Sequence, residues 1–163
     1  MESRVGVTFR RGAWSLLLLG LFIAGQSGRA EPLVVGANLG NVPWEFQARD
    51  GQYVGFEIDL ARALAEALGR DLELRNIPFN GLFAAVQSGR IDVAASSISV
   101  TPQRLGQVAF TQPFYDSDQS LTVLKASPVQ SLEDLKGRRV GVDTGSTGEI
   151  WATAAQGQYG IGS

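Results

Sequence analysis

Ser97, Ser99 and Arg104 are the residues whose types and spacing could bind a small anion. They follow an apolar stretch, and Thr101-Pro102 is typical of the start of a helix. Arg104 then falls in the first helical turn, where the backbone already carries about half a positive charge. A carboxylate held by the guanidinium, the serine hydroxyls and free backbone N–H groups would offset that charge. Two residues apart in an extended segment, the serine side chains would point the same way. The alternative is a polar loop in which Arg104 pairs with a nearby acid.

Two further stretches could contribute to a ligand site. Trp44 and Phe79 lie in loops after predicted strands, where each could line a small pocket or simply pack in the core. Residues 144–149 combine glycines with hydroxyls, which would let a ligand approach the backbone. Ser146 and Glu149 also have the spacing of an ordinary capping box. No lysine follows these glycines in the pattern of a phosphate-binding loop.

Composition excludes several kinds of chemistry. The chain of 163 residues has no Cys and no His, which rules out disulfides, thiolate metal sites and a Ser-His-Asp triad. We therefore expect neither a metal nor a cofactor. Beyond residue 30 the chain keeps 10 basic and 15 acidic residues, a net charge of −5. Without a basic patch, nucleic acid is not an expected partner.

Residues 1–30 have the features of a secretory signal. A basic start precedes an apolar run over residues 14–25, and Gly28 and Ala30 are small residues at a cleavage position. The run of 12 residues is shorter than the roughly 20 that span a membrane, so we expect cleavage near Ala30 rather than anchoring. The Arg10-Arg11 pair leaves twin-arginine and general secretion both open.

The elements that must position these residues alternate between strand and helix. Strands are predicted over 33–37, 72–77 and 139–142, with another from Ile91, and a hairpin over 46–54. Helices are predicted over 56–68, over 80–87 with Asn80 as cap, and over 146–155, with short helices from Thr101 and Ser131. This alternation predicts an α/β fold with a mostly parallel sheet, which binds ligands beyond the carboxyl ends of its strands. The candidate residues follow those ends.

Three stretches resemble one family. Residues 55–60 (Gly-Phe-Glu-Ile-Asp-Leu), 96–104 (Ser-Ser-Ile-Ser-Val-Thr-Pro-Gln-Arg) and 110–115 (Phe-Thr-Gln-Pro-Phe-Tyr) are similar to motifs of type 3 extracellular solute-binding proteins. These are receptors for amino-acid ABC importers, and the similarity runs from about Leu33 to Trp151. The resemblance implies a periplasmic binding protein-like fold of two lobes, with an amino acid bound between them. It also implies a periplasmic monomer that docks on a membrane permease and is not an enzyme.

The resemblance also assigns roles to residues. Arg104 and Ser99 would hold the ligand α-carboxylate, with Thr147 reaching across from the second lobe, and Ser97 would meet the α-ammonium through its carbonyl. Phe79 would pack on the ligand side chain, and amides at positions 38 and 41 favour a polar or neutral ligand. The binding residues expected from pattern and resemblance together are Asn38, Asn41, Trp44, Phe79, Ser97, Ser99, Arg104 and Thr147.

The same resemblance predicts the organisation of the chain. Residues 31–115 would form lobe 1 without its returning elements, and residues 116–163 the crossover and the beginning of lobe 2, so we expect a truncated or frameshifted form. Two alternatives stay open. One is a periplasmic dehydratase of the cyclohexadienyl or arogenate type on the same fold, and the other is the input domain of a sensor.

Overall fold

A three-stranded parallel sheet organises the N-terminal part of the computed structural model, which describes residues 30–162. β1 (Leu33–Ala37) lies in the centre, with β4 (Leu72–Asn76) on one side and β5 (Val93–Ala94) on the other. β1 pairs with β4 in parallel along its whole length, and its central residues pair with β5. A strand covered on both faces is expected to be continuously apolar, as the sequence of β1 is. The predicted α/β fold with a parallel sheet is confirmed.

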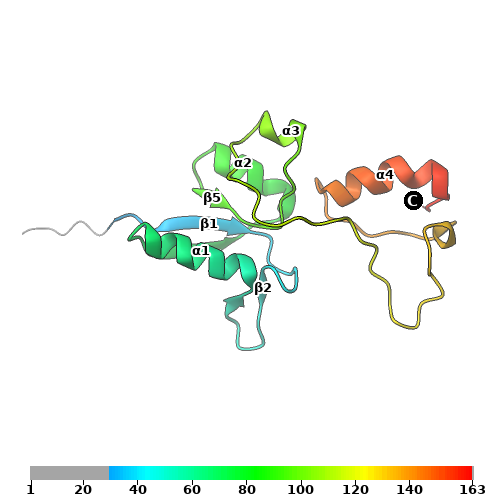
Figure 1. Ribbon diagram of the computed structural model, residues 1–163, viewed down its shortest axis with the longest axis horizontal. Helices are drawn as coiled ribbons and strands as arrows, with labels where there is room; N and C mark the ends of the chain where they lie inside the picture. The colour runs from blue at the N-terminus through cyan, green and yellow to red at the C-terminus, as the bar shows by residue number, and fades with distance from the viewer. Residues whose placement is uncertain (1–29, 163) are drawn as a thin grey trace, which may run out of the picture.

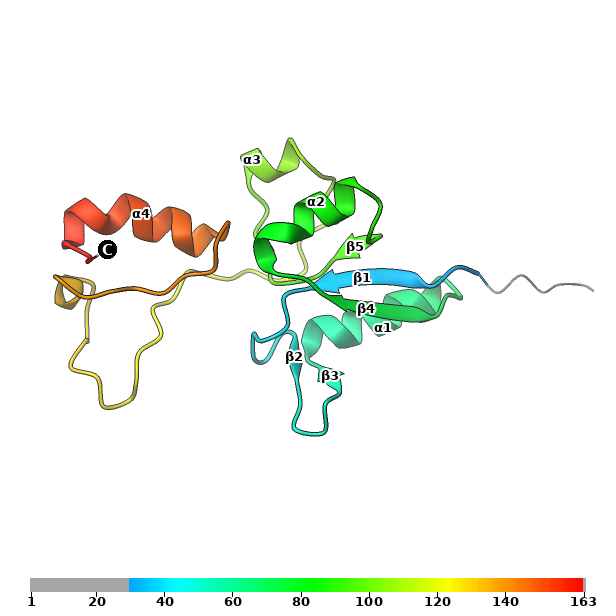
Figure 2. The same cartoon turned by 180° about the vertical axis from the view of Figure 1, so that it is seen from behind.

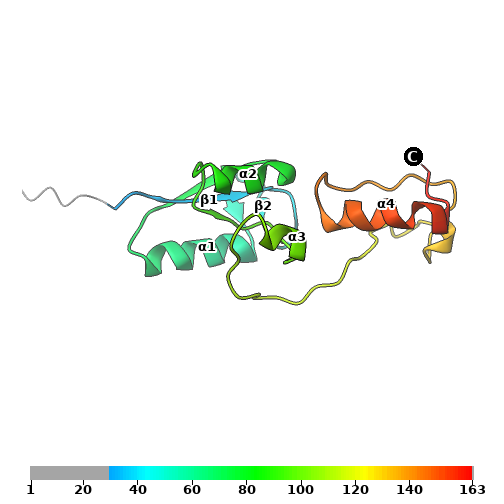
Figure 3. The ribbon, with the colours of Figure 1, turned by 90° about the horizontal axis from the view of Figure 1, so that it is seen from above.

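Helices α1 (Phe56–Ala67) and α2 (Leu82–Gln87) cover opposite faces of this sheet, as Figure 3 shows from above. On the α1 side the buried residues are Leu33, Val35, Ala61 and Ala65. On the α2 side they are Ile77, Leu82, Ala85 and Ile91. These two clusters hold the sheet and fix the direction in which its strand ends point.

The predicted helix over 56–68 is confirmed by α1, and the side that packs on the sheet is made of small residues. Ala61 and Ala65 pack on the sheet, because their short side chains let the helix approach the strands closely. The leucines that reveal the helix in the sequence, Leu60, Leu64 and Leu68, are 40%, 39% and 53% exposed. The leucine spacing therefore predicts the helix correctly, while the alanines beside it form the contact.

The hairpin of β2 (Phe46–Gln47) and β3 (Tyr53–Val54) leads into α1, and the loop before the hairpin caps the helix without a side chain. The backbone N–H groups at the start of α1 donate to the carbonyls of Pro43 and Trp44 at 3.1 and 2.9 Å. Gly55 makes this contact possible, since its φ is 124° and a Cβ there would lie 2.3 Å from the Trp44 carbonyl oxygen. A larger residue would force the loop away from the helix.

Two local predictions are wrong. Asn80 does not cap a helix, because residues Phe79–Gly81 form a 3₁₀ turn (η1) and α2 begins after Gly81 with no side-chain cap. The expected strand over 139–142 does not form, since within the described residues Arg139 makes only an isolated bridge, to Gly162. A strand needs a partner along its length, and this segment has one bridging residue.

The C-terminal part is small and set apart from the sheet. It consists of a 3₁₀ helix, η2 (Glu133–Leu135), and α4 (Thr147–Tyr159), which runs beyond the predicted end at residue 155. Figures 1 and 2 show both elements joined to the sheet by a long extended segment. One cluster supports them, made of Val129, Leu135, Ala155 and Ile161. Over residues 30–162 no helix combines the length and apolar character that a membrane span requires.

Candidate ligand-binding site

Arg104 is positioned by the short helix α3 (Pro102–Leu105), whose predicted start is confirmed. The Thr101 hydroxyl accepts a hydrogen bond from the backbone N–H of Arg104 at 3.3 Å, and Pro102 is the first helical residue. This cap fixes the first turn, so the arginine side chain projects from a defined point. Only 6% of Arg104 is exposed.

The Arg104 guanidinium is held by carbonyls and aromatic rings. Nη1 donates to the Ser99 carbonyl at 2.8 Å and Nη2 to the Gly145 carbonyl at 3.0 Å. Its central carbon lies 5.3 and 5.2 Å from the ring centroids of Phe79 and Phe83, which is cation–π distance. Burial lowers the pKa of Arg104 from its ordinary value. Within residues 30–162 it pairs with no carboxylate, so the alternative of an internal ion pair is wrong.

Thr147 comes to the same place from the C-terminal part. It is the first residue of α4, and the α4 start is the end of that helix nearer the sheet in Figure 1. Its hydroxyl lies 3.5 Å from the Ser99 hydroxyl and accepts a bond from Gln119 Nε2 at 3.0 Å. Ser146 caps the helix by accepting from the Glu149 backbone N–H at 3.1 Å, as the capping-box pattern predicts. The cap thereby places Thr147 opposite Ser99.

Ser97 and Ser99 have different hydrogen-bonding partners. This differs from the expectation that both side chains point the same way along a regular extended segment. Ser97 has a φ of 48°, and a residue in this left-handed region breaks the alternation of side chains along the chain. Its backbone N–H donates to both carboxylate oxygens of Glu57, at 3.0 and 2.9 Å. Its hydroxyl accepts from Asn41 Nδ2 at 3.0 Å. Ser97 therefore faces the Asn41 loop, whereas Ser99 faces α4.

Asn38 is tied to the same segment through its backbone. Its N–H donates to the Ser96 hydroxyl at 3.0 Å, and that hydroxyl donates to Glu45 Oε1 at 3.0 Å. Burial, a side-chain interaction with Glu57 and the charge of Glu57 raise the pKa of Glu45 to about 9. Neither acid is among the residues predicted from the sequence. The available signal is the position of each glutamate among apolar neighbours, in Trp44-Glu45-Phe46 and Phe56-Glu57-Ile58.

Trp44 belongs to an aromatic cluster. Its ring meets Tyr115 edge-on at 4.6 Å and Phe56 at 5.7 Å between centroids. The eight predicted residues thus fall into three groups. One contains Phe79, Ser99, Arg104 and Thr147, a second contains Asn38, Asn41 and Ser97, and Trp44 stands in the third. The segment 96–99 joins the first two groups.

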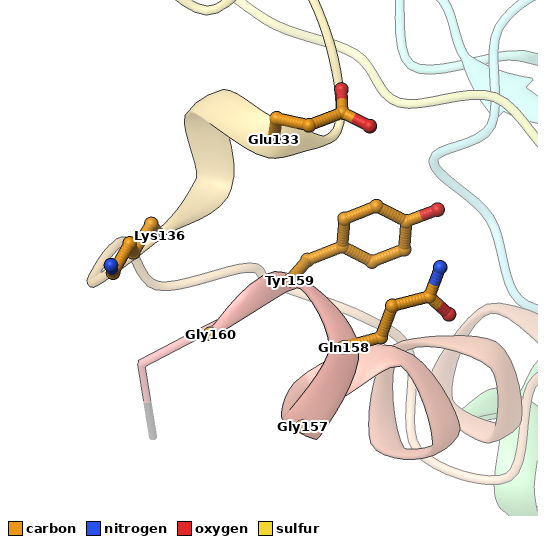
Figure 4. Close-up of a pocket in the computed structure, with 6 residues that line it drawn as sticks. All are labelled: Glu133, Lys136, Gly157, Gln158, Tyr159 and Gly160. Atoms are coloured by element: carbon orange, nitrogen blue, oxygen red, sulfur yellow. The ribbon is translucent and has the colours of Figure 1, made fainter.

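Two surface hollows lie elsewhere. Figure 4 shows one between η2 and the end of α4, where the charged ends of Glu133 and Lys136 point apart around Tyr159. Another lies beside the end of β4 and is lined by Arg75 and Arg90. Neither contains a predicted site residue. In the part of the chain that the structure describes, no group of three or more acidic residues is placed to hold a metal ion.

A parallel α/β sheet with a buried arginine and hydroxyls beyond its strand ends is an arrangement typical of proteins that bind small ligands. Residues 33–154 match the family described as bacterial extracellular solute-binding proteins, family 3. The chain belongs to this family, which confirms the resemblance found in the sequence.

Individual relatives agree with this assignment. The chain is 33% identical to the arginine-binding extracellular protein ArtP of Bacillus subtilis, over 91% of this chain and 58% of ArtP. A solved structure of an ancestral arginine-binding protein bound to glutamine is 38% identical, with a TM-score of 0.74, over 80% of this chain and 58% of that one. An ancestral amino acid-binding protein, described as a precursor of cyclohexadienyl dehydratase, is 34% identical with a TM-score of 0.68, over 78% of this chain and 57% of that one. The chain thus spans a little over half the length of these relatives.

Proposed function

We propose that the chain binds an amino acid as the solute-binding component of an ABC importer, with Arg104 as the anchor for the α-carboxylate. The observation that carries this proposal is the near-complete burial of a guanidinium beside the hydroxyls of Ser99 and Thr147. Membership of the solute-binding family and similarity to named amino-acid-binding proteins support it.

The chemistry of the Arg104 group suits a carboxylate. A guanidinium presents a planar fork of N–H donors that matches two carboxylate oxygens. The Phe79 and Phe83 rings hold the plane of the fork and exclude water on that side, which strengthens charged contacts. Ser99 and Thr147 would add hydroxyl donors. In this proposal the Ser97 carbonyl accepts from the α-ammonium, and Phe79 packs on the ligand side chain.

The ligand in this proposal has a polar or neutral side chain. Asn38 and Asn41 carry amides, not carboxylates, and Asn41 donates to Ser97. An amide can both donate and accept, which suits another amide such as that of glutamine. A basic side chain would call for an acid there. The relative solved with glutamine bound belongs to an arginine-binding lineage, so both ligands are worth testing.

The proposed setting is the periplasm. Residues 1–30 would direct export with cleavage near Ala30, although residues 1–29 lie outside those that the structure describes. The proposed lobe 1 covers residues 31–115, and the crossover with the start of lobe 2 covers residues 116–163. The protein would act as a monomer and deliver its ligand to a membrane permease.

Binding without catalysis is part of this proposal. The carboxyl group with the raised pKa, Glu45, would be the natural candidate for a general acid. It is 1% exposed and lies behind Ser96, where a substrate would not reach it. This arrangement favours a receptor over a dehydratase, even though one solved relative is described as a precursor of such an enzyme.

Calorimetry with L-glutamine, L-arginine and L-histidine tests the proposal. We expect binding by the chain, loss of at least about 100-fold in affinity for Arg104→Ala and about 10-fold for Arg104→Lys, which keeps the charge without the fork. Arg62→Ala is the matched control, since Arg62 pairs with Asp59 on the exposed side of α1. Near-normal affinity in Arg104→Ala would refute the site, and failure of all three amino acids to bind would refute the function.

A further inference from the structure

Glu45 and Glu57 form a buried acid pair that the proposed ligand contacts do not use. Each glutamate is 1% exposed, and their side chains interact directly. Glu45 precedes β2, and Glu57 lies in the first turn of α1, so the pair joins the hairpin to the helix. Buried carboxyl groups are unusual unless they are hydrogen-bonded, and two of them in contact are rarer still. Their partners therefore indicate what the pair holds in place.

Every polar partner of the pair belongs to the segment or loop that carries predicted site residues. The Ser97 backbone N–H donates to both oxygens of Glu57, and the Ser97 hydroxyl lies 3.5 Å from an oxygen of each acid. The Ser96 hydroxyl links Glu45 to the backbone of Asn38. The Asn41 side chain hydrogen-bonds to Glu45 and also donates to the Ser97 hydroxyl. Asn38, Asn41 and Ser97 are thus all connected to the pair.

The distribution of charge follows from these contacts. Two carboxylates in contact inside a protein do not both ionise, because each negative charge disfavours the other. Glu57 is the better place for the charge, since it accepts the Ser97 N–H with both oxygens and lies at the helix N-terminus. Glu45 then keeps the proton, consistent with the raised pKa of its carboxyl group.

We propose that Glu45 and Glu57 are positioning residues that share one proton and, through it, hold both Ser97 and the Asn38–Asn41 loop in the geometry of the ligand site. Ser97 has a backbone conformation that L residues seldom adopt, and the two-oxygen contact from Glu57 compensates for it. The description of these residues as a ligand site rests on the proposed function, whereas the shared proton does not.

Loss of the proton from Glu45 would weaken the contacts that hold Ser97 and those that hold the Asn38–Asn41 loop. Above pH 9 the pair would carry two negative charges, and the groups that act on Glu45 are Glu57, Ser96 and Asn41, none of which is a cation. We expect the repulsion to separate the acids and to disturb the backbone at Ser97. The backbone at Ser97 would thereby acquire a pH dependence from residues that do not touch the ligand.

The test is a titration of the chain without ligand, followed by nuclear magnetic resonance. We expect the Glu45 side-chain carboxyl ¹³C signal to report a protonated group at pH 7 and to titrate near pH 9, with the Ser97 amide signal moving at the same midpoint. In Glu45→Gln the alkaline step at Ser97 should vanish. In Glu57→Gln the Glu45 midpoint should fall only in part, because burial, the largest cause of the raised pKa, remains while the charge of Glu57 is gone. Glu66→Gln, an exposed position of α1, is the control and should leave the titration unchanged.

Two results would overturn the proposal. One is a Glu45 carboxyl that titrates in the ordinary acid range, and the other is a Ser97 amide that does not respond to the Glu45 titration. Wild-type and Glu45→Gln titrations decide the matter even where Glu57→Gln does not fold. Amino-acid affinity at pH 7 adds the functional readout, since Glu57→Gln should bind at least 10-fold more weakly, whereas the control Glu66→Gln should bind normally. A shared proton in a chain that binds no amino acid would show that the proposed function, not the acid pair, is wrong.

Discussion

The N-terminal and C-terminal parts of the molecule differ in what holds them together. The sheet region has a buried cluster on each face of β1, and side chains from two helices contribute to them. The C-terminal part has one cluster of four residues, supplied by η2, α4 and the flanking chain. Because stability grows with the apolar surface that folding removes from water, we expect the first region to be more stable than the second. Arg104 and Ser99 lie where the two parts meet. The proposed site therefore combines residues of the more stable sheet region with residues of the less stable C-terminal part.

The two parts also differ in their response to acid and base. In the sheet region Glu45 has a raised pKa, so the folded state holds a proton that the unfolded chain releases. In the C-terminal part, backbone N–H groups of Gln130 and Ser131 donate to Asp134 and lower its pKa below the ordinary 3.8. The pH dependence of stability should therefore have opposite signs in the two parts.

The largest expected effect is that of Leu82→Ala. Leu82 is fully buried on the α2 side of the sheet, so truncation leaves a cavity that costs about 2–5 kcal/mol of unfolding free energy. Urea unfolding followed through the indole signal of Trp44 measures the loss in the sheet region. A loss below about 1 kcal/mol would show that this core does not behave as a packed one.

Leu135→Ala is the counterpart in the C-terminal part. Leu135 is buried in the cluster there, but few residues surround it and they can move into the space that the leucine leaves. We therefore expect a loss of unfolding free energy at the lower end of the range for buried leucines, about 2 kcal/mol. The indole signal of Trp151, which stacks on Tyr159, should broaden or move while that of Trp44 stays in place. Simultaneous change of both signals would show that the two parts unfold as one.

Changing the pH should separate the two parts without mutation. Between about pH 4.5 and 9 the folded sheet region holds one more proton than the unfolded chain, so its stability falls as pH rises, by about 1.4 kcal/mol per unit at most. Asp134 acts in the other direction, because its contribution is present above pH 3.8 and is lost as pH falls through the lowered value. Thermal unfolding from pH 3 to 9, followed at Trp44 and Trp151, checks both slopes. Glu45→Gln should flatten the first slope and leave the second.

The smallest expected effect is that of the α4 cap. Ser146→Ala removes the side-chain acceptor for the Glu149 N–H and should cost about 1 kcal/mol. Ser146→Asp keeps an acceptor and is the matched control. Amide hydrogen exchange in the first turn of α4 should accelerate for the alanine variant alone. Equal exchange in both variants would mean that the Gly145–Glu149 contact suffices to hold the helix start.

Local features account for what the sequence predicts well. The helix over 56–68 and the starts at Thr101 and Ser146 depend on residues within one or two turns, and all three are present in the structure. The buried arginine is also found, because its motif is contiguous with its cap. Its bond to the Gly145 carbonyl joins residues 41 positions apart and has no local signal.

The features that sequence analysis misses depend on distant residues meeting. The acid pair forms only when Glu45 and Glu57 reach the serine segment some 40–52 positions away, and the same meeting sets the unusual backbone of Ser97. The predicted strand over 139–142 fails for the related reason that apolar pattern cannot supply a neighbouring strand. Periodicity indicates what a segment could do, and its partners decide the outcome.

The close approach at Gly55 sets a rule for anyone who redesigns ligand preference. Randomised libraries at Asn38 and Asn41 vary side chains at the rim of the loop, where the backbone can stay as it is. A library that includes position 55 would lose most of its members, since any β-carbon collides with the Trp44 carbonyl. A redesign of the loop can therefore vary Asn38 and Asn41 but has to keep the glycine at its base.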